Sequence, residues 1–228
     1  MAERAKQLNG KLTGSRFLRN LLVPGGLRRD LDPGSWLAAA LGALRKEILA
    51  YTDRLERTNS FRDRLMTTGP LPYQLAFEQG STGPVKRASG IDRDLRRDHP
   101  YAGYEGLPLA VPLRTDGDAQ ARARVRIEEI DASVSLIQRV LSLLEPGDVR
   151  VPCEPSPESE GLGWAENPRG SLFYAVHFDA QARLKRVKIK SPSFSNWRVF
   201  PFTVHDSNMM DYAINEASFG LTIAGCDR

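Results

Sequence analysis

Two long stretches with a helical repeat of apolar residues constrain the fold of this chain most. In residues 34–57 and 116–144, apolar side chains recur at alternating spacings of four and three. That repeat places them on one face of a helix, which leaves water by packing against other helices. The sequence therefore predicts a helical bundle built around two long helices. The two stripes are Leu37, Leu41, Leu44, Ile48, Tyr51 and Leu55, and then Ala123, Ile127, Ile130, Val134, Ile137, Leu141 and Leu144.

The rest of the chain adds a small β component. Residues 172–178 and 184–190 alternate between apolar and polar, and the five residues between them suit a hairpin. The two prolines in residues 107–113 allow at most an edge strand there. Residues 1–10 are typical of the end of a helix that stops at Asn9-Gly10, so we expect a preceding part to be missing. The predicted fold class is mainly α (α+β), a bundle with one antiparallel hairpin and irregular charged loops.

We expect these pieces to form one domain. Residues 1–148 would be the helical bundle portion, which includes a charged loop at 83–107. The proline-rich residues 149–165 would be a surface linker. Residues 166–228 would supply the hairpin and a C-terminal tail of short helical pieces that completes the same domain.

Composition excludes several classes of protein. The chain has 228 residues, 41% of them hydrophobic, which is ordinary globular composition. The longest apolar run, residues 36–44, is far too short to span a bilayer, and the first residues lack the apolar core of a secretion signal. A net charge of +4 allows an acidic partner, a nucleic acid or an anionic membrane surface and does not choose among them.

The stretch from Gly83 to Tyr104 has the highest density of charged and other functional side chains in the chain. Its last 13 residues contain three Asp, three Arg, one His and two Tyr, and glycines and prolines punctuate the whole stretch. Such punctuation predicts an irregular loop with fixed turns. One interpretation is a solvated network of salt bridges between helices, and the other is a polar site held by a rigid scaffold. The residue pattern alone leaves both open.

Several motifs, in order, resemble one superfamily. They are LTGSR at 12–16, GPVKRASGIDRDLRRDHPYAGYEGL at 83–107, ENPRG at 166–170, KSPSFSN at 190–196 and the C-terminal SFGLTIAGCDR. This series is similar to the large subunit of membrane-bound, energy-converting nickel–iron hydrogenases, including formate hydrogenlyase. The superfamily that it resembles also contains the homologous 49-kDa quinone-site subunit of respiratory complex I. The resemblance runs from about Leu12 to the C-terminus and implies an oxidoreductase subunit.

The resemblance also implies site residues. The charged lining of an acceptor pocket would consist of Asp92, Asp94, Arg96, Arg97 and His99, with Arg169 opposite. Glu166, Pro192 and Ser193 would help to hold the bound group. Each assignment has a structural alternative: Arg169 could clamp Asp92 or Asp94, Ser191 or Ser193 could cap a helix, and His99 could be solvated or salt-bridged. His177 and His205 carry no assignment.

Two departures from the hydrogenase pattern bear on metals. The N-terminal part of the family, with its first Cys-x-x-Cys pair, is absent from this sequence. The positions that correspond to the second pair hold Thr222 and Gly225, and Cys226 is one place off. The chain's other cysteine, Cys153, lies in the proline-rich stretch. We therefore expect no metal site and no nickel–iron centre, because such a centre needs thiolate ligands.

Together these observations indicate a subunit of a membrane-associated, complex I-like or hydrogenase-related oxidoreductase. The expected partners are a small iron–sulfur subunit, membrane-arm subunits and the missing N-terminal part, and the expected acceptor is a quinone-type molecule. The isolated chain should bind no cofactor and be inactive, and the complex should lie on the cytoplasmic, inner face of the cell membrane. The alternative is a non-catalytic scaffold subunit that keeps only the fold. The basic residues show no nucleic-acid motif, so no nucleic acid is expected.

Overall fold

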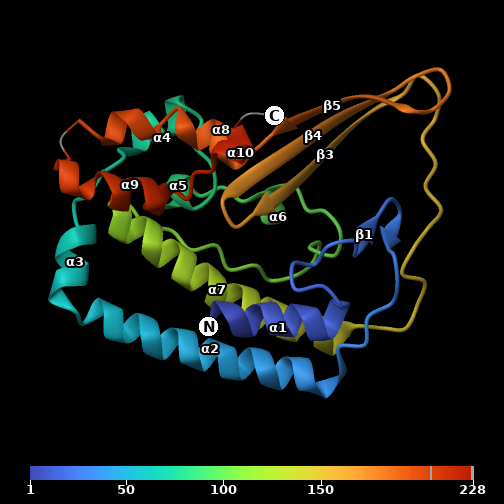
Figure 1. The fold of residues 1–228 in the computed structure, drawn as a ribbon, viewed down its shortest axis with the longest axis horizontal. Coiled ribbons are helices and arrows are strands. Elements are labelled where there is room, and N and C mark those ends of the chain that lie inside the picture. The colour runs from blue at the N-terminus through green and yellow to red at the C-terminus, as the bar shows by residue number, and fades with distance from the viewer. Residues whose placement is uncertain (206, 227–228) are drawn as a thin grey trace. The chain divides into compact units, whose positions relative to one another are not determined.

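The computed structural model describes residues 1–205 and 207–226 (Figure 1). The chain divides into two compact units, and the division cuts through both long helices. Unit one consists of Met1–Arg54 and Ser133–Pro155, and unit two of residues 55–132 and the chain from residue 156 onward. Helices dominate both units, and each contains a small antiparallel sheet, so the predicted α+β class is confirmed.

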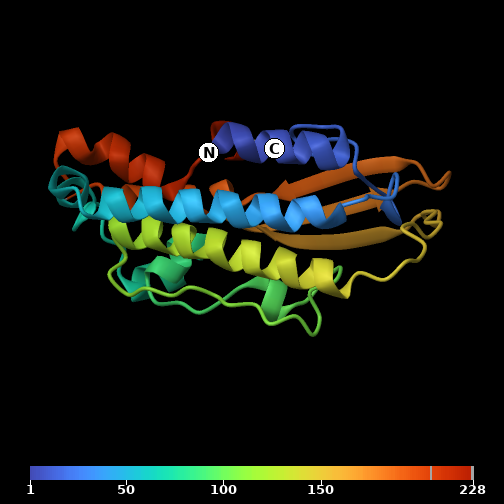
Figure 2. The same ribbon diagram turned by 90° about the horizontal axis from the view of Figure 1, so that it is seen from below.

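Unit one is a small helical assembly. Its elements are α1 (Ala2–Thr13), β1 (Leu22–Val23), β2 (Gly26–Leu27), most of α2 (Gly34–Glu56) and the C-terminal half of α7 (Ala119–Leu143). The three helices run side by side in this unit (Figure 2). Leu37 and Leu44 of α2 are buried, as is Val134 of α7, and these three belong to the predicted stripes. The apolar repeat therefore identified both long helices and part of their contact.

Two details of unit one differ from the sequence-based expectations. The first helix does not stop at Asn9-Gly10 but continues to Thr13. It ends at Gly14, whose φ of 72° is the left-handed conformation that closes a helix, and whose N–H donates to the Gly10 carbonyl at 2.8 Å. Residues 22–27, where no strand was predicted, form the short β1–β2 hairpin, with Leu22 opposite Leu27.

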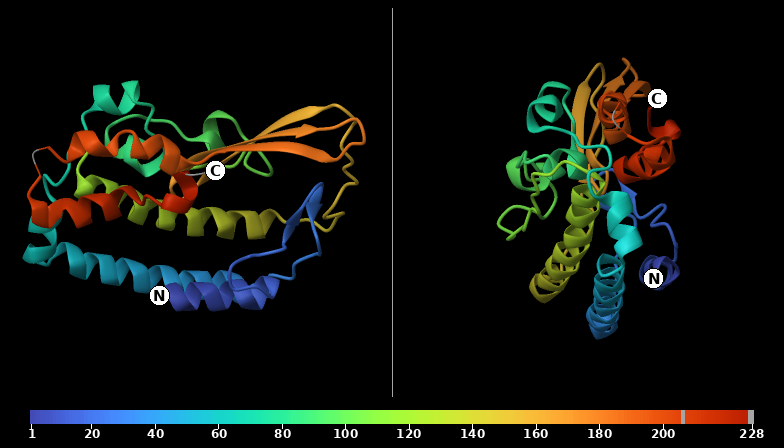
Figure 3. Two further views of the ribbon diagram at one scale, coloured as in Figure 1. Left: turned by 45° about the horizontal axis from the view of Figure 1, so that its top comes forward. Right: turned by 90° about the vertical axis from the view of Figure 1, so that its left-hand side faces the viewer.

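Unit two contains the remaining elements. They are α3 (Asn59–Leu65), α4 (Tyr73–Glu78), α5 (Gly83–Ala88), α6 (Leu95–Asp98), the N-terminal half of α7, β3 (Glu160–Asn167), β4 (Gly170–Phe178), β5 (Leu184–Lys190), α8 (Pro192–Trp197), the 3-10 turns Phe200–Thr203 and Met209–Asp211, α9 (Tyr212–Phe219) and α10 (Ile223–Cys226). Short helices gather at one end of the three-stranded sheet (Figure 3). The core between them consists of Leu71, Ala76, Val85, Ile91, Val199, Phe200 and Phe219.

The sheet of unit two has one strand more than the sequence predicted. β4 and β5 are the expected hairpin, but β3 pairs with β4 over its whole length, from Glu160 opposite His177 to Asn167 opposite Gly170. The prediction of a linker over 149–165 was therefore wrong at its C-terminal end. The run EGLGWAEN contains two glycines and no β-branched residue, so strand propensity gives no signal there. Its pairing with β4 supplies the stabilisation instead.

Two other regions of unit two correct the expectations, and a third, residues 107–113, is compatible with the expectation of at most an edge strand. The charged stretch 83–104 contains two short helices, α5 and α6, between its turns. Residues 107–113, all of which are described, form no strand. In the first half of α7 the buried side chains are Ala119, Ala121, Arg122 and Val125, whereas Ile130 of the predicted stripe is exposed. Here the helix buries small residues and one arginine rather than its largest apolar side chains.

None of the described helices is both long enough and apolar enough to cross a bilayer.

Candidate functional site

Arg87 lies at the centre of a buried ion cluster in unit two. Helix α5 begins with Gly83-Pro84, a favourable start because proline fixes the first helical φ. The helix directs Arg87 inward, where its side chain is 1% exposed. Its Nη1 lies 3.3 Å from Asp94 Oδ2 and 3.1 Å from Glu166 Oε1, and its Nη2 pairs with Glu129. One guanidinium thus contacts three carboxylates from three different segments.

Asp94 is the carboxylate most tightly held in this cluster. It caps α6 by accepting from the Arg96 N–H at 3.0 Å, and it also accepts from Arg96 Nε at 2.9 Å and Nη2 at 2.6 Å. Burial by itself would raise the pKa of Asp94, but the hydrogen bonds from Arg96 and the charge of Arg87 outweigh it and hold that pKa below its usual value. Asp94 therefore stays ionised, and its partners are Arg96 and Arg87, not Arg169.

The pKa of Glu166 is shifted in the opposite direction from that of Asp94. It lies near the end of β3 with a side chain that is 2% exposed, and it accepts from Arg87 and from the Ser171 hydroxyl at 2.8 Å. Burial raises the pKa of Glu166, and the contacts with Arg87 and Ser171 only partly offset that effect. Tyr101 fixes the backbone beside it, because the Glu166 N–H donates to Tyr101 Oη at 2.9 Å. Glu166 therefore takes up a proton more readily than Asp94 does.

Asp92 and Arg97 lie outside the buried cluster. Arg97 donates to Asp92 Oδ1 at 2.8 Å and to Asp98 Oδ1 at 2.9 Å, and the side chains of Arg97 and Asp92 are 37% and 53% exposed. Exposed ion pairs of this kind contribute little to stability. Both interpretations of the charged stretch are thus present in one segment, with a solvated network on its outer side and a buried cluster on its inner side.

Arg169 is exposed in the two-residue turn between β3 and β4. In the described part of the chain it makes no ion pair, and its backbone N–H donates to Asn167 Oδ1 at 2.8 Å. The turn itself is placed by glycine: Gly83, with a φ of 66°, contacts the turn so closely that a Cβ there would lie 2.4 Å from Gly170 Cα. The structure therefore brings the ENPRG motif against the start of α5, through its backbone.

Ser193, together with Ser191, holds the C-terminal segment, and Pro192 is buried in the first turn of α8. Ser191 caps α8 by accepting from the Phe194 N–H at 3.2 Å, which is the structural alternative expected for this motif. Ser191 Oγ also donates to the Gly225 carbonyl, and Ser193 Oγ accepts from the Thr222 N–H at 3.2 Å. Residues 227–228, which close the C-terminal motif, lie outside the described residues.

A cavity of about 240 Å³ lies beside the buried cluster. Two of the predicted site residues, Asp94 and His99, line it. His99 ends α6, and its carbonyl accepts from Trp164 Nε1 at 3.0 Å, which ties this segment to β3. Polar side chains dominate the lining, and the main ones are Lys86, Arg93, Asp94, Asp98, His99 and Ser171.

The sequence-based prediction missed Arg87 and Lys86, although both lie in the motif at 83–107. A signal was present in their neighbours. The residues that flank the pair, Val85 and Ala88, are apolar and fully buried. Two consecutive bases in so short and buried a helix cannot both reach solvent, so one of them must find partners inside.

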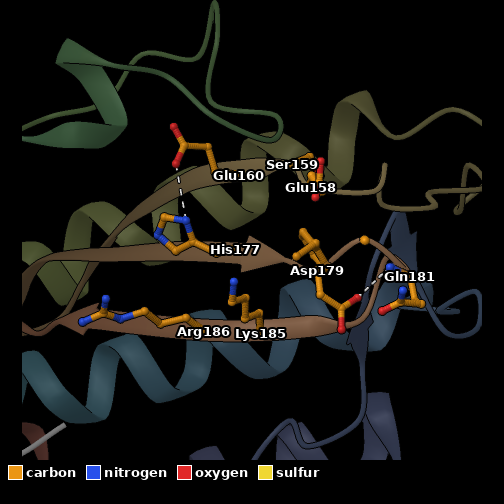
Figure 4. Close-up of a pocket in the computed structure, with 10 residues that line it drawn as sticks. Glu158, Ser159, Glu160, His177, Asp179, Gln181, Lys185 and Arg186 are labelled. Atoms are coloured by element: carbon orange, nitrogen blue, oxygen red, sulfur yellow. Dashed lines mark hydrogen bonds and ion pairs between the residues drawn. The ribbon is translucent and has the colours of Figure 1, made fainter.

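A second, larger depression of about 650 Å³ lies at the tip of the three-stranded sheet (Figure 4). His177 Nδ1 and Glu160 Oε2 face each other across the sheet there at 3.3 Å, with side chains that are 40% and 79% exposed. Asp179 accepts from the N–H groups of Gln181 and Arg183 to form the turn. These contacts are those of a solvated hairpin end, and no residue predicted for the site lies there.

The donor groups of this chain do not suit a metal centre held by thiolates. Across residues 1–205 and 207–226, no three His, Cys, Asp or Glu side chains are grouped so that they could hold a metal ion. Thr222 and Gly225, which the resemblance to hydrogenases aligns with their terminal cysteine pair, are hydrogen-bonded to Ser193 and Ser191. Hydroxyl and backbone groups do not replace soft thiolate ligands for nickel or iron.

Comparisons with known proteins place this geometry in context. The family model described as the respiratory-chain NADH dehydrogenase, 49 Kd subunit, matches residues 2–157 and 153–228. A subunit of the NADH-quinone oxidoreductase of Methylacidiphilum infernorum is 32% identical over an alignment 251 positions long, and this alignment covers 96% of this chain and 59% of the relative. A subunit of the Thermus thermophilus enzyme is 32% identical over an alignment 248 positions long, and this alignment covers 95% of this chain and 60% of the relative. The chain thus spans about three-fifths of the length of these relatives.

A solved structure shares the fold. A chain in the structure of the membrane-bound sulfane sulfur reductase, an archaeal respiratory membrane complex, superimposes with a TM-score of 0.90 and 28% identity. The superposition covers 99% of this chain and 64% of that chain.

Proposed function

Since this chain belongs to the family of the 49-kDa subunit of respiratory-chain NADH dehydrogenase, we propose that it is the acceptor-side subunit of a membrane-associated, complex I-like oxidoreductase. In that complex, electrons from an iron–sulfur cluster of a partner subunit would reduce a quinone-type acceptor. This chain would form a wall of the acceptor pocket and supply protons. The proposal assigns no metal ion to this chain.

The observation that carries the proposal is the position of the 240 Å³ cavity against the buried ion cluster. Asp94 lines the cavity and also contacts Arg87, which in turn contacts Glu166 and Glu129. A group that reacts in the cavity is therefore one residue away from a cluster of ionised side chains with little access to water. In such surroundings water screens charges little, so a change of charge in the cavity strongly affects the ionised side chains next to it.

This arrangement suits proton coupling. Reduction of a quinone to a quinol consumes two electrons and two protons, so the pocket must deliver protons as electrons arrive. Burial and the neighbouring charge of Arg93 lower the pKa of Lys86, which makes it a readier proton donor than an exposed lysine. Burial raises the pKa of Glu166, which makes it a readier proton store than an exposed glutamate. His99 lines the same cavity and is the third group able to move a proton.

Other parts of the reaction belong to other subunits under this proposal. The sequence has no glycine-rich nucleotide fingerprint, so oxidation of NADH or another donor would take place elsewhere in the complex. A small iron–sulfur subunit would deliver the electrons, and membrane-arm subunits would anchor the assembly on the inner face of the membrane. Curated relatives of this chain are subunits of NADH-quinone oxidoreductases, and the solved neighbour comes from a respiratory membrane complex, which supports such an assembly.

A scaffold role without redox chemistry is the second candidate. One observation favours it: Asp94 is saturated by arginine side chains, as in a purely structural ion cluster. In this case the cluster would hold the ENPRG turn, α5 and α6 together, and the cavity would have no occupant.

Turnover of the assembled complex separates the two candidates. His99→Gln and Arg93→Gln alter exposed side chains at the cavity without touching the Arg87 cluster, and His177→Gln at the sheet tip is the control. Reduction of decylubiquinone, and in parallel of polysulfide, is measured with membranes in which native gels show full assembly. The proposal expects kcat/KM for the quinone to fall about 10-fold or more in the two cavity variants, and to be unchanged in the control. Unchanged kinetics in all three variants would favour the scaffold, and loss of polysulfide reduction alone would make the acceptor a sulfur compound.

A further inference from the structure

Two cations line the 240 Å³ cavity without a direct ion-pair partner. They are Lys86 on α5 and Arg93 on the segment before α6. Neither forms a salt bridge within the described residues, whereas Arg87, Arg96 and Arg97 around them all do. The side chain of Lys86 is half-buried, so its ammonium group has partly lost water and gained no carboxylate in direct contact.

The carboxylates that line the same cavity are already engaged. Asp94 accepts from Arg96, and Asp98 accepts from Arg97 Nε at 2.9 Å and from the Asp94 N–H at 3.1 Å. The hydroxyl of Ser171 is likewise used, because it donates to Glu166. Lys86 and Arg93 therefore remain as donors without acceptors around this cavity.

The charges around Lys86 also favour the binding of an anion in this cavity. Burial lowers the pKa of Lys86, and the charge of Arg93 lowers it further, against the opposite effects of Glu166 and Asp98. Two like charges at one cavity destabilise each other unless an anion lies between them. An oxygen atom with negative charge is the group that both side chains would hold by charge-assisted hydrogen bonds.

We propose that Lys86 and Arg93 form an oxyanion site for the acceptor, and that the site selects quinones by the negative charge on a ring oxygen. That charge is permanent on an ionised hydroxyquinone and develops on the carbonyl oxygen of a neutral quinone as electrons arrive. Phe77 also lines the cavity, and its ring stacks on Tyr73 with centroids 6.4 Å apart, which supplies an apolar wall for the ring. The inference rests on the proposed function. It adds which charge the substrate carries and which residues bind the charged oxygen.

The cavity volume limits what can enter. A pocket for a drug-sized ligand measures about 300–1,000 Å³, so 240 Å³ accommodates one small ring system and leaves any long tail outside. A bicyclic naphthoquinone without a tail is therefore the appropriate probe.

Equilibrium binding tests the site without turnover. The purified assembled complex that contains this chain is titrated calorimetrically with 2-hydroxy-1,4-naphthoquinone, which is ionised at neutral pH, and with 1,4-naphthoquinone, its neutral counterpart. Lys86→Met should weaken binding of the ionised probe about 10- to 100-fold and change binding of the neutral probe by less than about 3-fold. Arg93→Gln should act in the same sense. Lys185→Met, an exposed lysine at the sheet tip, is the matched control and should bind both probes normally.

The outcomes separate this inference from the proposed function. If both probes lose affinity equally in Lys86→Met, or if Lys185→Met causes the loss, the oxyanion site is wrong, even where the complex reduces quinones. If the ionised probe alone depends on Lys86 while the complex reduces no quinone, the oxyanion site stands and the proposed function fails. Arg93 is exposed, so Arg93→Gln decides the matter should Lys86→Met not fold, as judged by circular dichroism.

Discussion

Arg87 Nη1 and Asp94 Oδ2 lie 3.3 Å apart, and the two side chains are 1% and 0% exposed. The pair joins α5 to the cap of α6, and Glu166 and Glu129 bring β3 and α7 to the same guanidinium. Taking charges out of water is costly, so a cluster of this kind is stable only while every member keeps its partner. Arg87 therefore holds together α5 and α6, whose residues Lys86 and Asp98 line the neighbouring cavity.

Removal of Arg87 should destabilise the fold severely. Arg87→Met leaves three carboxylates close together without their shared cation, and loss of one partner from a buried ion pair costs about 3–5 kcal/mol. Arg97→Gln, which breaks only exposed pairs with Asp92 and Asp98, should cost less than about 1 kcal/mol. Urea denaturation of the full chain measures both. Equal losses in the two variants would contradict the assignment of a buried and a solvated half.

Glu166 and Asp94 should give opposite pH dependences. The pKa of Glu166 is raised on folding, so its contribution to the free energy of unfolding is present below the unfolded pKa, near about 4.3, and is lost as pH rises through the folded pKa. Glu166→Gln has no carboxyl that titrates at this position. The stability of this variant relative to wild type should therefore increase as pH rises from the unfolded pKa of Glu166 to its folded pKa. The pKa of Asp94 is lowered, so the contribution of Asp94 is present above about 3.9 and is lost as pH falls through the folded pKa.

Urea denaturation of wild type, Glu166→Gln and Asp94→Asn across pH 3–7 (about the range of these titrations) checks the two signs. The slope with pH is the readout, because a constant offset between variants reflects only lost contacts. Asp94→Asn should lose stability relative to wild type as pH rises. Parallel curves for all three proteins would show that neither carboxyl has a shifted pKa.

Arg122 should stabilise unit two through its hydrogen bonds and through its contact with the Phe219 ring, whose centroid lies 4.4 Å from the guanidinium carbon. It is fully buried, and it donates to the carbonyls of Gly69 at 3.0 Å and Gly117 at 2.6 Å and to Asn215 Oδ1 at 3.0 Å. Burial lowers the pKa of Arg122 to about 9, so the side chain is still charged at neutral pH. Arg122→Met leaves the Gly69 carbonyl and Asn215 Oδ1 without the donor that Arg122 supplies, whereas the Gly117 carbonyl still accepts from the Leu71 N–H, and the change should cost about 2–4 kcal/mol. Arg124→Met on the same helix breaks only the exposed pair with Glu56 and should cost less than about 1 kcal/mol.

The contact between α5 and the ENPRG turn should tolerate no side chain at Gly83. Gly83 and Gly80 both have positive φ values, 66° and 69°, so alanine is strained at either position. A Cβ at Gly83 would lie 2.4 Å from Gly170 Cα, whereas a Cβ at Gly80 would meet nothing within 4 Å. Gly83→Ala should therefore prevent folding or shift the midpoint of thermal unfolding far more than Gly80→Ala does. Similar midpoints for the two variants would mean that the turn does not pack on α5 as described.

The sequence predicted some of these features and could not predict others. The apolar repeats identified α2 and α7, and the motif order indicated the family that the family model confirmed. Strand β3 was missed because its stability comes from pairing with a distant segment rather than from its own residues. The charged stretch at 83–107 was recognised as important, yet which charges are buried depends on long-range contacts. Glu166 and Arg87, 79 residues apart, form one such contact.

The order of importance within the predicted site also changes. Asp94, Arg96 and Glu166 belong to the buried cluster, and His99 lines the cavity beside it. Asp92 and Arg97 form the solvated pairs, Arg169 is exposed in a turn, Ser193 supports the C-terminal segment, and Pro192 is buried at the start of α8. Spacing along the sequence cannot separate these groups, because neighbours such as Arg96 and Arg97 pair with different carboxylates, one buried and one exposed.

Photoaffinity labelling of the assembled complex tests the central claim, that the acceptor occupies the cavity beside the Arg87 cluster. An azido-substituted quinone is cross-linked during turnover, with excess decylubiquinone as the competitor, and the labelled peptides of this chain are mapped by mass spectrometry. The account predicts competable label within residues 77–99, which include Phe77, Lys86, Arg93 and His99. Competable label confined to residues 158–186 at the sheet tip, where the larger depression lies, would contradict it.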